Sequence, residues 1–263
     1  MIVAINPLFT SMTLVSALAY AGLAWGHRAF SPRLSRWVFG LAWATHGLAL
    51  VGYVMQRPLM FGFAFAVSAM AWVVSTVYGV ETQLYPRLRT RWVLAALGSF
   101  SVLLAWLFPG RHHPLLVTPW LTMHWVLGFA SYGLFAVAVF HAWLLQRAED
   151  AMRHATPESD LPPILKLERL TFRFTNVAYL LLSITLLGGM AFSETLFGVA
   201  WRWEHKTVFA LLAWLTITLL LLGRWRWGWR GKQAARVLYL GAAFLLLSYV
   251  GSRFVMDMVL HRP

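Results

Sequence analysis

The sequence contains no cysteine and few acidic residues. Its 263 residues include nine Asp and Glu against 22 Lys and Arg, and only 12% of all residues are charged. Without cysteine the chain forms no disulfide, binds no metal through thiolates and exchanges no thiols. Any thiol chemistry in its function must therefore belong to a partner. So small a charged fraction also excludes an ordinary soluble domain of this length.

Hydrophobic residues, in contrast, make up 60% of the chain and gather in long runs. A helix needs about 20 apolar residues to cross a hydrocarbon core. The runs predict an all-α, polytopic membrane bundle of about eight transmembrane helices, forming a single integral membrane domain over residues 1–263. The expected segments are Pro7–Trp25, Trp37–Met55, Phe61–Val80, Trp92–Phe108, Trp120–Gln146, Phe174–Phe192, His205–Leu222 and Val237–Leu260.

The basic residues are segregated by side. Most Lys and Arg residues fall in the loops after the first, third, fifth and seventh segments. Such loops stay in the cytoplasm, so both termini are expected on the outer, periplasmic side. The net charge of +13 then indicates membrane topology, and no nucleic acid is expected as a partner.

Two shorter features concern how the helices are joined and how they pack. Residues 147–173 form a charged cytoplasmic connector that contains "LPPILKLERLTFRF", a pattern that predicts a short interfacial helix on the lipid surface before the sixth segment. Within that segment, Gly188 and Gly189 most simply allow close helix packing, because small residues let backbones approach.

Four of the nine histidines stand out by their expected depth. His124, His205 and His261 fall at the outer ends of the fifth, seventh and eighth segments. His46 lies about 14 Å below the outer surface at 1.5 Å per residue, where an ionisable residue is a candidate functional group. Neutral imidazole is a common axial ligand of haem iron, so a b-type haem held between two of these histidines is one hypothesis.

Tryptophan is abundant at the outer mouth of the seventh segment, in "AWRWEHK". The indoles of Trp201 and Trp203 offer a flat apolar surface on which a porphyrin could lie. The alternative is an ordinary interfacial belt, since tryptophan is enriched at both membrane surfaces. The equally tryptophan-rich "RWRWGWR" at residues 224–230, among cytoplasmic arginines, is interpreted as such an anchor.

The stretch "FGVAWRWEHKTVFALLAW" at residues 197–214 resembles the WWD signature of cytochrome c assembly proteins of the CcsA, CcmC and HemX type, close to WGxxWxWDxKExxxLxxW. The match defines an outer WWD-like loop at residues 193–206. "THGLAL" around His46 is similar to the family's intramembrane histidine segment. His124 and His261 stand where outer histidines flank the signature. The compact length is most like the YpjD- and HemX-like inner-membrane subgroup.

The resemblance implies a multi-pass protein of the bacterial inner membrane that handles haem b in cytochrome c biogenesis. His124 and His261 would be the axial ligands of the iron, with Trp201, Trp203, His46 and His205 as further cofactor-binding candidates. No catalytic residue is assigned, and a stand-alone enzyme is not expected. The chain would instead be a component of a haem lyase or synthase system, with a ResB-like protein and apocytochrome c as partners.

The chain also departs from the family's pattern. Phe197, Glu204 and Thr207 replace the signature's Trp, Asp and Glu, and Leu222 stands where larger members have a second intramembrane histidine. These differences keep an alternative open. The chain would then be a HemX-like regulatory or scaffolding membrane protein of haem metabolism that binds no stoichiometric haem.

Overall fold

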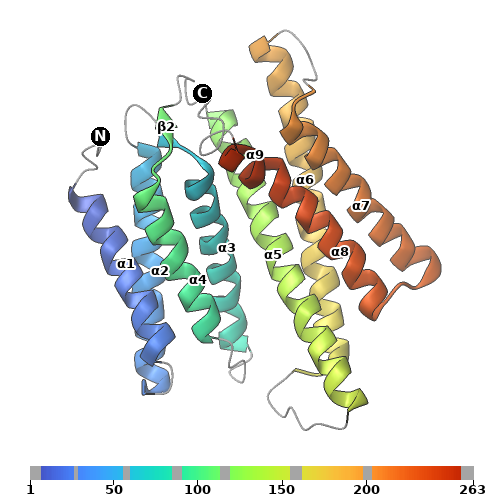
Figure 1. Cartoon of the computed structure of the whole chain (residues 1–263), viewed down its shortest axis with the longest axis horizontal. Helices are drawn as coiled ribbons and strands as arrows, with labels where there is room; N and C mark the ends of the chain where they lie inside the picture. Colours follow the sequence, from blue (N-terminus) through green and yellow to red (C-terminus); the bar gives the residue numbers. More distant parts are fainter. Residues whose placement is uncertain are drawn as a thin grey trace. The chain divides into compact units, whose positions relative to one another are not determined.

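A computed structural model describes residues 7–26, 29–55, 60–84, 91–112, 119–154, 162–197 and 203–255. Nearly all of these residues are helical (Figure 1). Seven described helices are long and apolar enough to cross a membrane, and an eighth apolar helix is slightly shorter. The predicted all-α polytopic membrane fold is confirmed. The orientation of the termini stays a prediction.

The contacts divide the chain into two compact units. Unit 1 contains α1 (Pro7–Trp25), α2 (Pro32–Met55), α3 (Phe63–Leu84) and α4 (Arg91–Leu107), with the antiparallel pair β1 (Met60–Phe61) and β2 (Arg111–His112). Unit 2 contains α5 (Pro119–Arg153), α6 (Ile164–Phe197), α7 (His205–Trp227) and α8 (Gly231–Leu246), followed by the π-helical turn η2 (Leu247–Gly251) and α9 (Ser252–Phe254).

In unit 1, small residues and serines bring the helices together. Ser16 of α1 donates a hydrogen bond to the carbonyl of Ala42 in α2, and Ser99 of α4 donates to that of Ala17, both at 2.9 Å. Such short side chains satisfy their hydroxyls on a neighbouring backbone and permit close approach where no hydrophobic force acts between helices. The core beside them includes Tyr20, which is fully buried.

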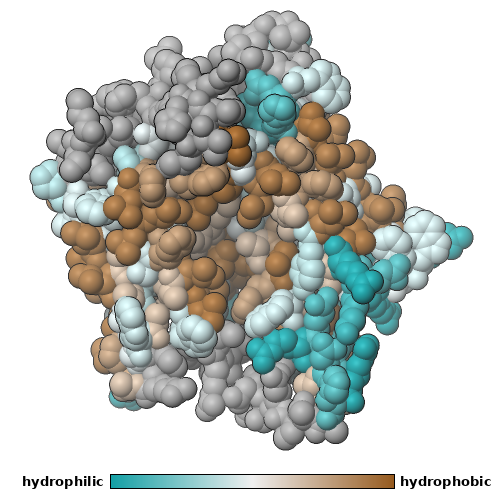
Figure 2. Space-filling model, viewed as in Figure 1, coloured by the Kyte–Doolittle hydropathy of each residue, from teal (hydrophilic) through white to brown (hydrophobic). Residues whose placement is uncertain are grey.

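Unit 2 packs its four long helices around the inner face of α7. Ala213, Ile217 and Leu220 lie one turn apart on this helix and are essentially inaccessible to solvent. Two further bonds join α7 to α6: Trp214 Nε1 donates to Ser183 at 2.9 Å, and the Tyr179 and Thr218 hydroxyls lie 2.8 Å apart. Figure 2 shows hydrophobic side chains over the middle of the helices of unit 2 and hydrophilic ones near the turn between α7 and α8.

The connector differs from the sequence-based expectation. Residues 164–173, which we expected to form a separate interfacial helix, are the first turns of the continuous helix α6. The physical reason is the position of the helix breakers, because Pro162 and Pro163 precede the helix and no glycine or proline follows until Gly188. α5 likewise continues to Arg153, beyond the expected end at Gln146.

Candidate functional site

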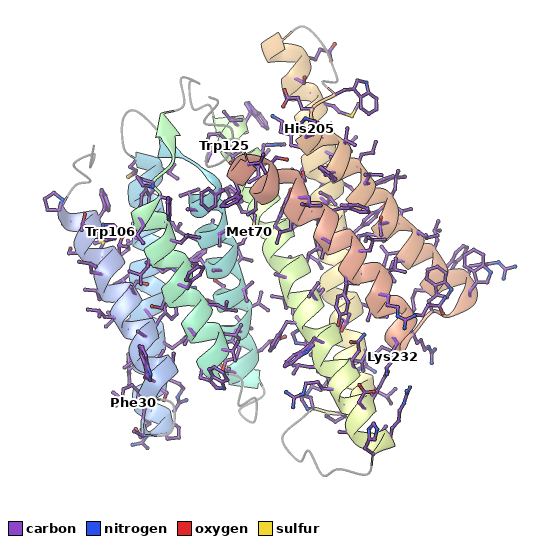
Figure 3. All side chains as sticks on the ribbon, viewed as in Figure 1. Phe30, Met70, Trp106, Trp125, His205 and Lys232 are labelled. Atoms are coloured by element: carbon purple, nitrogen blue, oxygen red, sulfur yellow. The ribbon has the colours of Figure 1, made fainter. Side chains whose placement is uncertain are left out.

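At one end of unit 2, α5 and α7 begin while α6 and α8 end. We call this the histidine end, after His124 in the second turn of α5 and His205 at the start of α7. Figure 3 shows Trp125 and His205 at this end of the unit and Lys232 at the opposite end. Two of the predicted site histidines are thus at the same end of one helical unit.

His124 lies against the two consecutive glycines of α6. A Cβ atom added to Gly188 would lie 3.6 Å from Nδ1 of His124, and one added to Gly189 would lie 3.3 Å from Cε1. Nδ1 is buried. The Nδ1–Cε1 edge of the imidazole therefore faces α6. The glycines, which we expected to serve helix packing in general, leave the space that this ring occupies.

Two charged residues pair at the start of α7. Lys206 Nζ is 2.8 Å from Glu204 Oε2, with the two side chains 58% and 36% exposed. Glu204 is the N-cap residue through its carbonyl, which accepts from the N–H groups of Thr207 and Val208, and its side chain makes no capping bond. A carboxylate there still suits the helix dipole.

The π-helical turn η2 connects α8 to this region. Ser248 donates a hydrogen bond to the carbonyl of Lys206 at 2.7 Å. One turn of wider π geometry shifts the side chains that follow it and often occurs at functional sites. The next residue, Tyr249, meets Phe129 of α5 edge to face at 6.1 Å. These contacts hold the starts of α5 and α7 together.

The other predicted site residues are distributed as follows. Trp203 is 75% exposed and His205 is exposed. Trp201, His261 and part of the expected loop 193–206 lie outside the described residues. His46 lies in unit 1 and is 1% exposed, and its Nε2 is 2.8 Å from the Ser68 hydroxyl. The polar partner that its depth required is therefore a serine of α3.

In the described ranges, no three His, Asp or Glu side chains gather as a metal site. What the histidine end offers a metal is a single well-packed imidazole. One imidazole on one side of the iron is how histidine serves as an axial haem ligand. The donor set of this end therefore fits haem, with the exposed indole of Trp203 two residues before α7 and an exposed lysine in the first turn of α7.

The opposite end of unit 2 is also rich in tryptophan and charge. We call it the arginine end, where α7 ends and α8 begins, around Arg224 and Arg230. Here Glu168 of α6, 12% exposed, pairs with Arg224 and lies 3.8 Å from Arg230. Arg224 also lies over the Phe172 ring. At this end, one largely buried carboxylate lies between two arginines and offsets part of their charge.

Sequence reasoning did not identify Ser248 or the role of Gly188 and Gly189 at the histidine end. A glycine pair indicates space but not what fills it. Nothing in "LLLSYVG" announces a π-helical turn, because that turn depends on backbone hydrogen bonds rather than on apolar spacing. Both features are visible only once α5, α6 and α8 are placed together.

These features define a polytopic helical membrane protein with a packed imidazole at one end of a helix bundle. The family model of the cytochrome C assembly protein matches residues 34–260. The chain therefore belongs to the cytochrome c assembly protein family, as the resemblance of residues 197–214 predicted.

Individual relatives are more distant. The chain is 28% identical over 170 residues to the inner membrane protein YpjD of Escherichia coli strain K12, an alignment that covers 64% of each protein. It is 32% identical over 144 residues to an uncharacterized 28.8 kDa protein of Azospirillum brasilense, covering 54% of this chain and 53% of that one. It is 31% identical over 102 residues to the cytochrome c biogenesis protein CcsA of Synechococcus sp. strain WH7803, covering 37% and 32%. The chain thus spans just under two thirds of the first of these relatives.

Proposed function

We propose that the chain takes part in cytochrome c biogenesis by holding haem b at the histidine end of unit 2. The observation that carries the proposal is His124, whose ring lies against Gly188 and Gly189 of α6 at the same end of unit 2 as His205. Membership of the cytochrome c assembly protein family supports the same role. The histidine end is then the periplasmic end of the bundle in a bacterial inner membrane, consistent with the name of the YpjD relative.

In this proposal His124 and His261 are the two axial ligands of the iron. Trp201 and Trp203 supply the flat apolar surface for the porphyrin. Lys206 and His205, both exposed at the start of α7, are placed to meet the propionates. His46 has its Nε2 bonded to Ser68, so we assign it to a second position within the membrane rather than to the outer pair.

The chain's own contribution is to bind, orient and shield. Haem supplies the vinyl groups to which the two thiols of an apocytochrome c add. Those thiols belong to the substrate, since this chain has no cysteine. Holding the haem in one orientation lowers the entropic cost of bringing its vinyl groups and the thiols together. A ResB-like partner would deliver the apocytochrome, and the chain would act as one component of a synthase system.

The first test is an absorption spectrum of the detergent-purified protein, oxidised and dithionite-reduced, with a pyridine haemochrome assay for stoichiometry. We expect about one haem per chain. His124→Ala and His261→Ala should each lower haem retention by at least several-fold. His154→Ala is the matched control, because this exposed residue at the far end of α5 bonds only locally, to the Asp150 carbonyl.

A featureless spectrum that persists after haem is added back would overturn the proposal. The HemX-like regulatory or scaffolding role would then be the better account, and Leu222 at the position of the second intramembrane histidine already agrees with it. Equal losses in all three histidine variants would instead contradict the ligand assignment.

A further inference from the structure

One exposed face of α6 combines two arginines with an apolar stripe. We call it the lipid face, and it consists of Arg169, Arg173, Val177, Leu180 and Ile184, all of them exposed. We propose that the lipid face binds an anionic phospholipid, with the two guanidinium groups on the headgroup phosphate and the aliphatic side chains along the acyl chains. Such a site belongs to the chain itself and does not depend on haem.

The spacing of these residues places them on one side of the helix. Each lies three or four positions after the one before it, and residues at that spacing are neighbours on a helix surface. The other side of α6 packs inside unit 2, where Leu167, Ala178 and Leu182 are buried. A contiguous apolar surface that stays exposed marks a site of contact with lipid or with a partner.

The two arginines of the lipid face carry charge that the described residues do not neutralise. Glu168, the acid next to them in the sequence, pairs with Arg224 and lies 3.8 Å from Arg230 instead. In the part of the chain that the structure describes, no carboxylate pairs with Arg169 or Arg173. Like charges four residues apart on a helix repel each other, so an anion that contacts both would stabilise this turn of α6.

A phosphate group suits this pair of arginines. Guanidinium is planar, stays charged and donates parallel hydrogen bonds to phosphate oxygens. Arg169 and Arg173 are separated by a rise of about 6 Å along the helix axis, which long side chains can bridge to reach one headgroup. The aliphatic stems of arginine side chains also lie readily on apolar surface while the charged heads stay in water.

The apolar part of the lipid face distinguishes a phospholipid from a free anion. From Arg173 to Ile184 the helix rises about 16 Å, and one leaflet of a bilayer contains about 15 Å of hydrocarbon. Val177, Leu180 and Ile184 would therefore follow the acyl chains through one leaflet while the arginines lie at the depth of the headgroups. Anionic lipids are attracted to basic residues at that depth.

Arg153, in the last turn of α5, provides a matched contrast. It is exposed, as the two arginines of the lipid face are, and it lies at the same end of unit 2. One turn before it on α5 are Glu149 and Asp150, so acidic residues adjoin it in place of an apolar stripe. Arg153 therefore tests whether any exposed cation at this end is sufficient.

The first experiment measures lipid binding to the full chain in detergent by native mass spectrometry, with phosphatidylglycerol and phosphatidylcholine added separately. We expect wild type to bind phosphatidylglycerol several-fold more tightly. Arg169→Gln/Arg173→Gln should lose most of this preference and keep its affinity for phosphatidylcholine, which also shows that the variant is folded. Arg169→Lys/Arg173→Lys should keep part of the preference, and Arg153→Gln should keep all of it.

Three results of this experiment would overturn the proposal. The first is an equal preference in wild type and Arg169→Gln/Arg173→Gln. The second is a loss of the same size in Arg153→Gln. The third is displacement of phosphatidylglycerol by inorganic phosphate at an equal concentration, because it would identify a site for the free anion.

A second experiment locates the lipid on α6. Because the chain has no cysteine, Leu180→Cys supplies a single thiol for a fluorescent label in vesicles with equal amounts of the two lipids. Brominated acyl chains should quench this label more strongly on phosphatidylglycerol than on phosphatidylcholine, and Arg169→Gln/Arg173→Gln should remove the difference. Leu18→Cys is the control, since it is exposed on α1, which contains no Lys or Arg. Equal quenching by the two lipids at Leu180→Cys would overturn the proposal.

Discussion

At both ends of unit 2, an aromatic side chain packs against glycine residues of a helix. The two aromatic side chains differ in chemistry. At the arginine end, a Cβ on Gly223 would lie 2.3 Å from the Trp229 ring. At the histidine end, Gly188 and Gly189 admit the imidazole of His124. An indole in such a space contributes apolar packing, whereas an imidazole there keeps a nitrogen that can bind a metal.

The charged groups at the two ends of unit 2 also differ in how far they are exposed. The arginine end closes on Glu168, which is largely buried between arginines. The backbone N–H of Trp229 donates to the Gly223 carbonyl. Gly228 has a positive φ of 66°, which is typical of a helix C-cap. At the histidine end, Glu204, Lys206 and Trp203 are half-exposed or exposed. The arginine end is stabilised by partly buried ion pairs and a capped helix, whereas the histidine end leaves polar and aromatic groups accessible.

The largest effect should come from adding a methyl group at the arginine end. In Gly223→Ala the new Cβ would overlap the rigid Trp229 indole, so the ring must shift away from α7. Overpacking of this kind costs about 2–3 kcal/mol. Thermal unfolding in detergent should show a clear loss, with an unchanged haem spectrum in the fraction that folds. Gly40→Ala is the control, since nothing lies within 4 Å of its Cβ.

A change in the haem spectrum of folded Gly223→Ala protein would break the comparison, because it would show that the two ends are coupled. An unchanged unfolding temperature would show that Trp229 moves at little cost and that the packing of Trp229 against Gly223 does not stabilise the arginine end.

Removing the carboxylate at the arginine end should have the next largest effect. Glu168→Gln leaves Arg224, 31% exposed, without its charged partner, and we expect a loss of about 1.5 kcal/mol. Asp150→Asn is the matched control, because its pair with Lys232 is 48% and 43% exposed and exposed ion pairs contribute little to stability. Equal losses of unfolding free energy in the two variants would show that burial does not distinguish the two pairs.

The sequence predicted the number and type of the helices well. α1 has the expected bounds, Pro7–Trp25. Four of the other helices, α2, α5, α6 and α7, extend beyond their apolar segments. Hydropathy identifies the part of a helix that lies in lipid, whereas α2 begins five residues early with Arg33 and Arg36 in its first turns, and α5 carries charged residues to Arg153. Helical hydrogen bonding continues into water, where apolar spacing no longer marks it.

The candidate site was predicted in part. His124 was singled out by its depth and by the family resemblance, but its contact with α6 depends on the rotation of two helices about their axes. Both helices carry apolar residues on all sides, so their sequences do not indicate which side of each helix faces its neighbour. The π-helical turn at Leu247–Gly251 was likewise missed, because the residues around it read as an uninterrupted helix.

The smallest expected effect tests how the histidine end is tied together. Ser248→Ala removes the bond to the Lys206 carbonyl, which should cost about 1 kcal/mol. Because helix starts fray easily, the loss should be local: hydrogen exchange should rise in the first turn of α7 and stay unchanged at its arginine end. Ser252→Ala is the control, since that hydroxyl bonds only the Leu247 carbonyl, within its own turn. Equal exchange in the two variants would mean that η2 does not fix the start of α7, and that the histidine end depends on the contact between α5 and α6 alone.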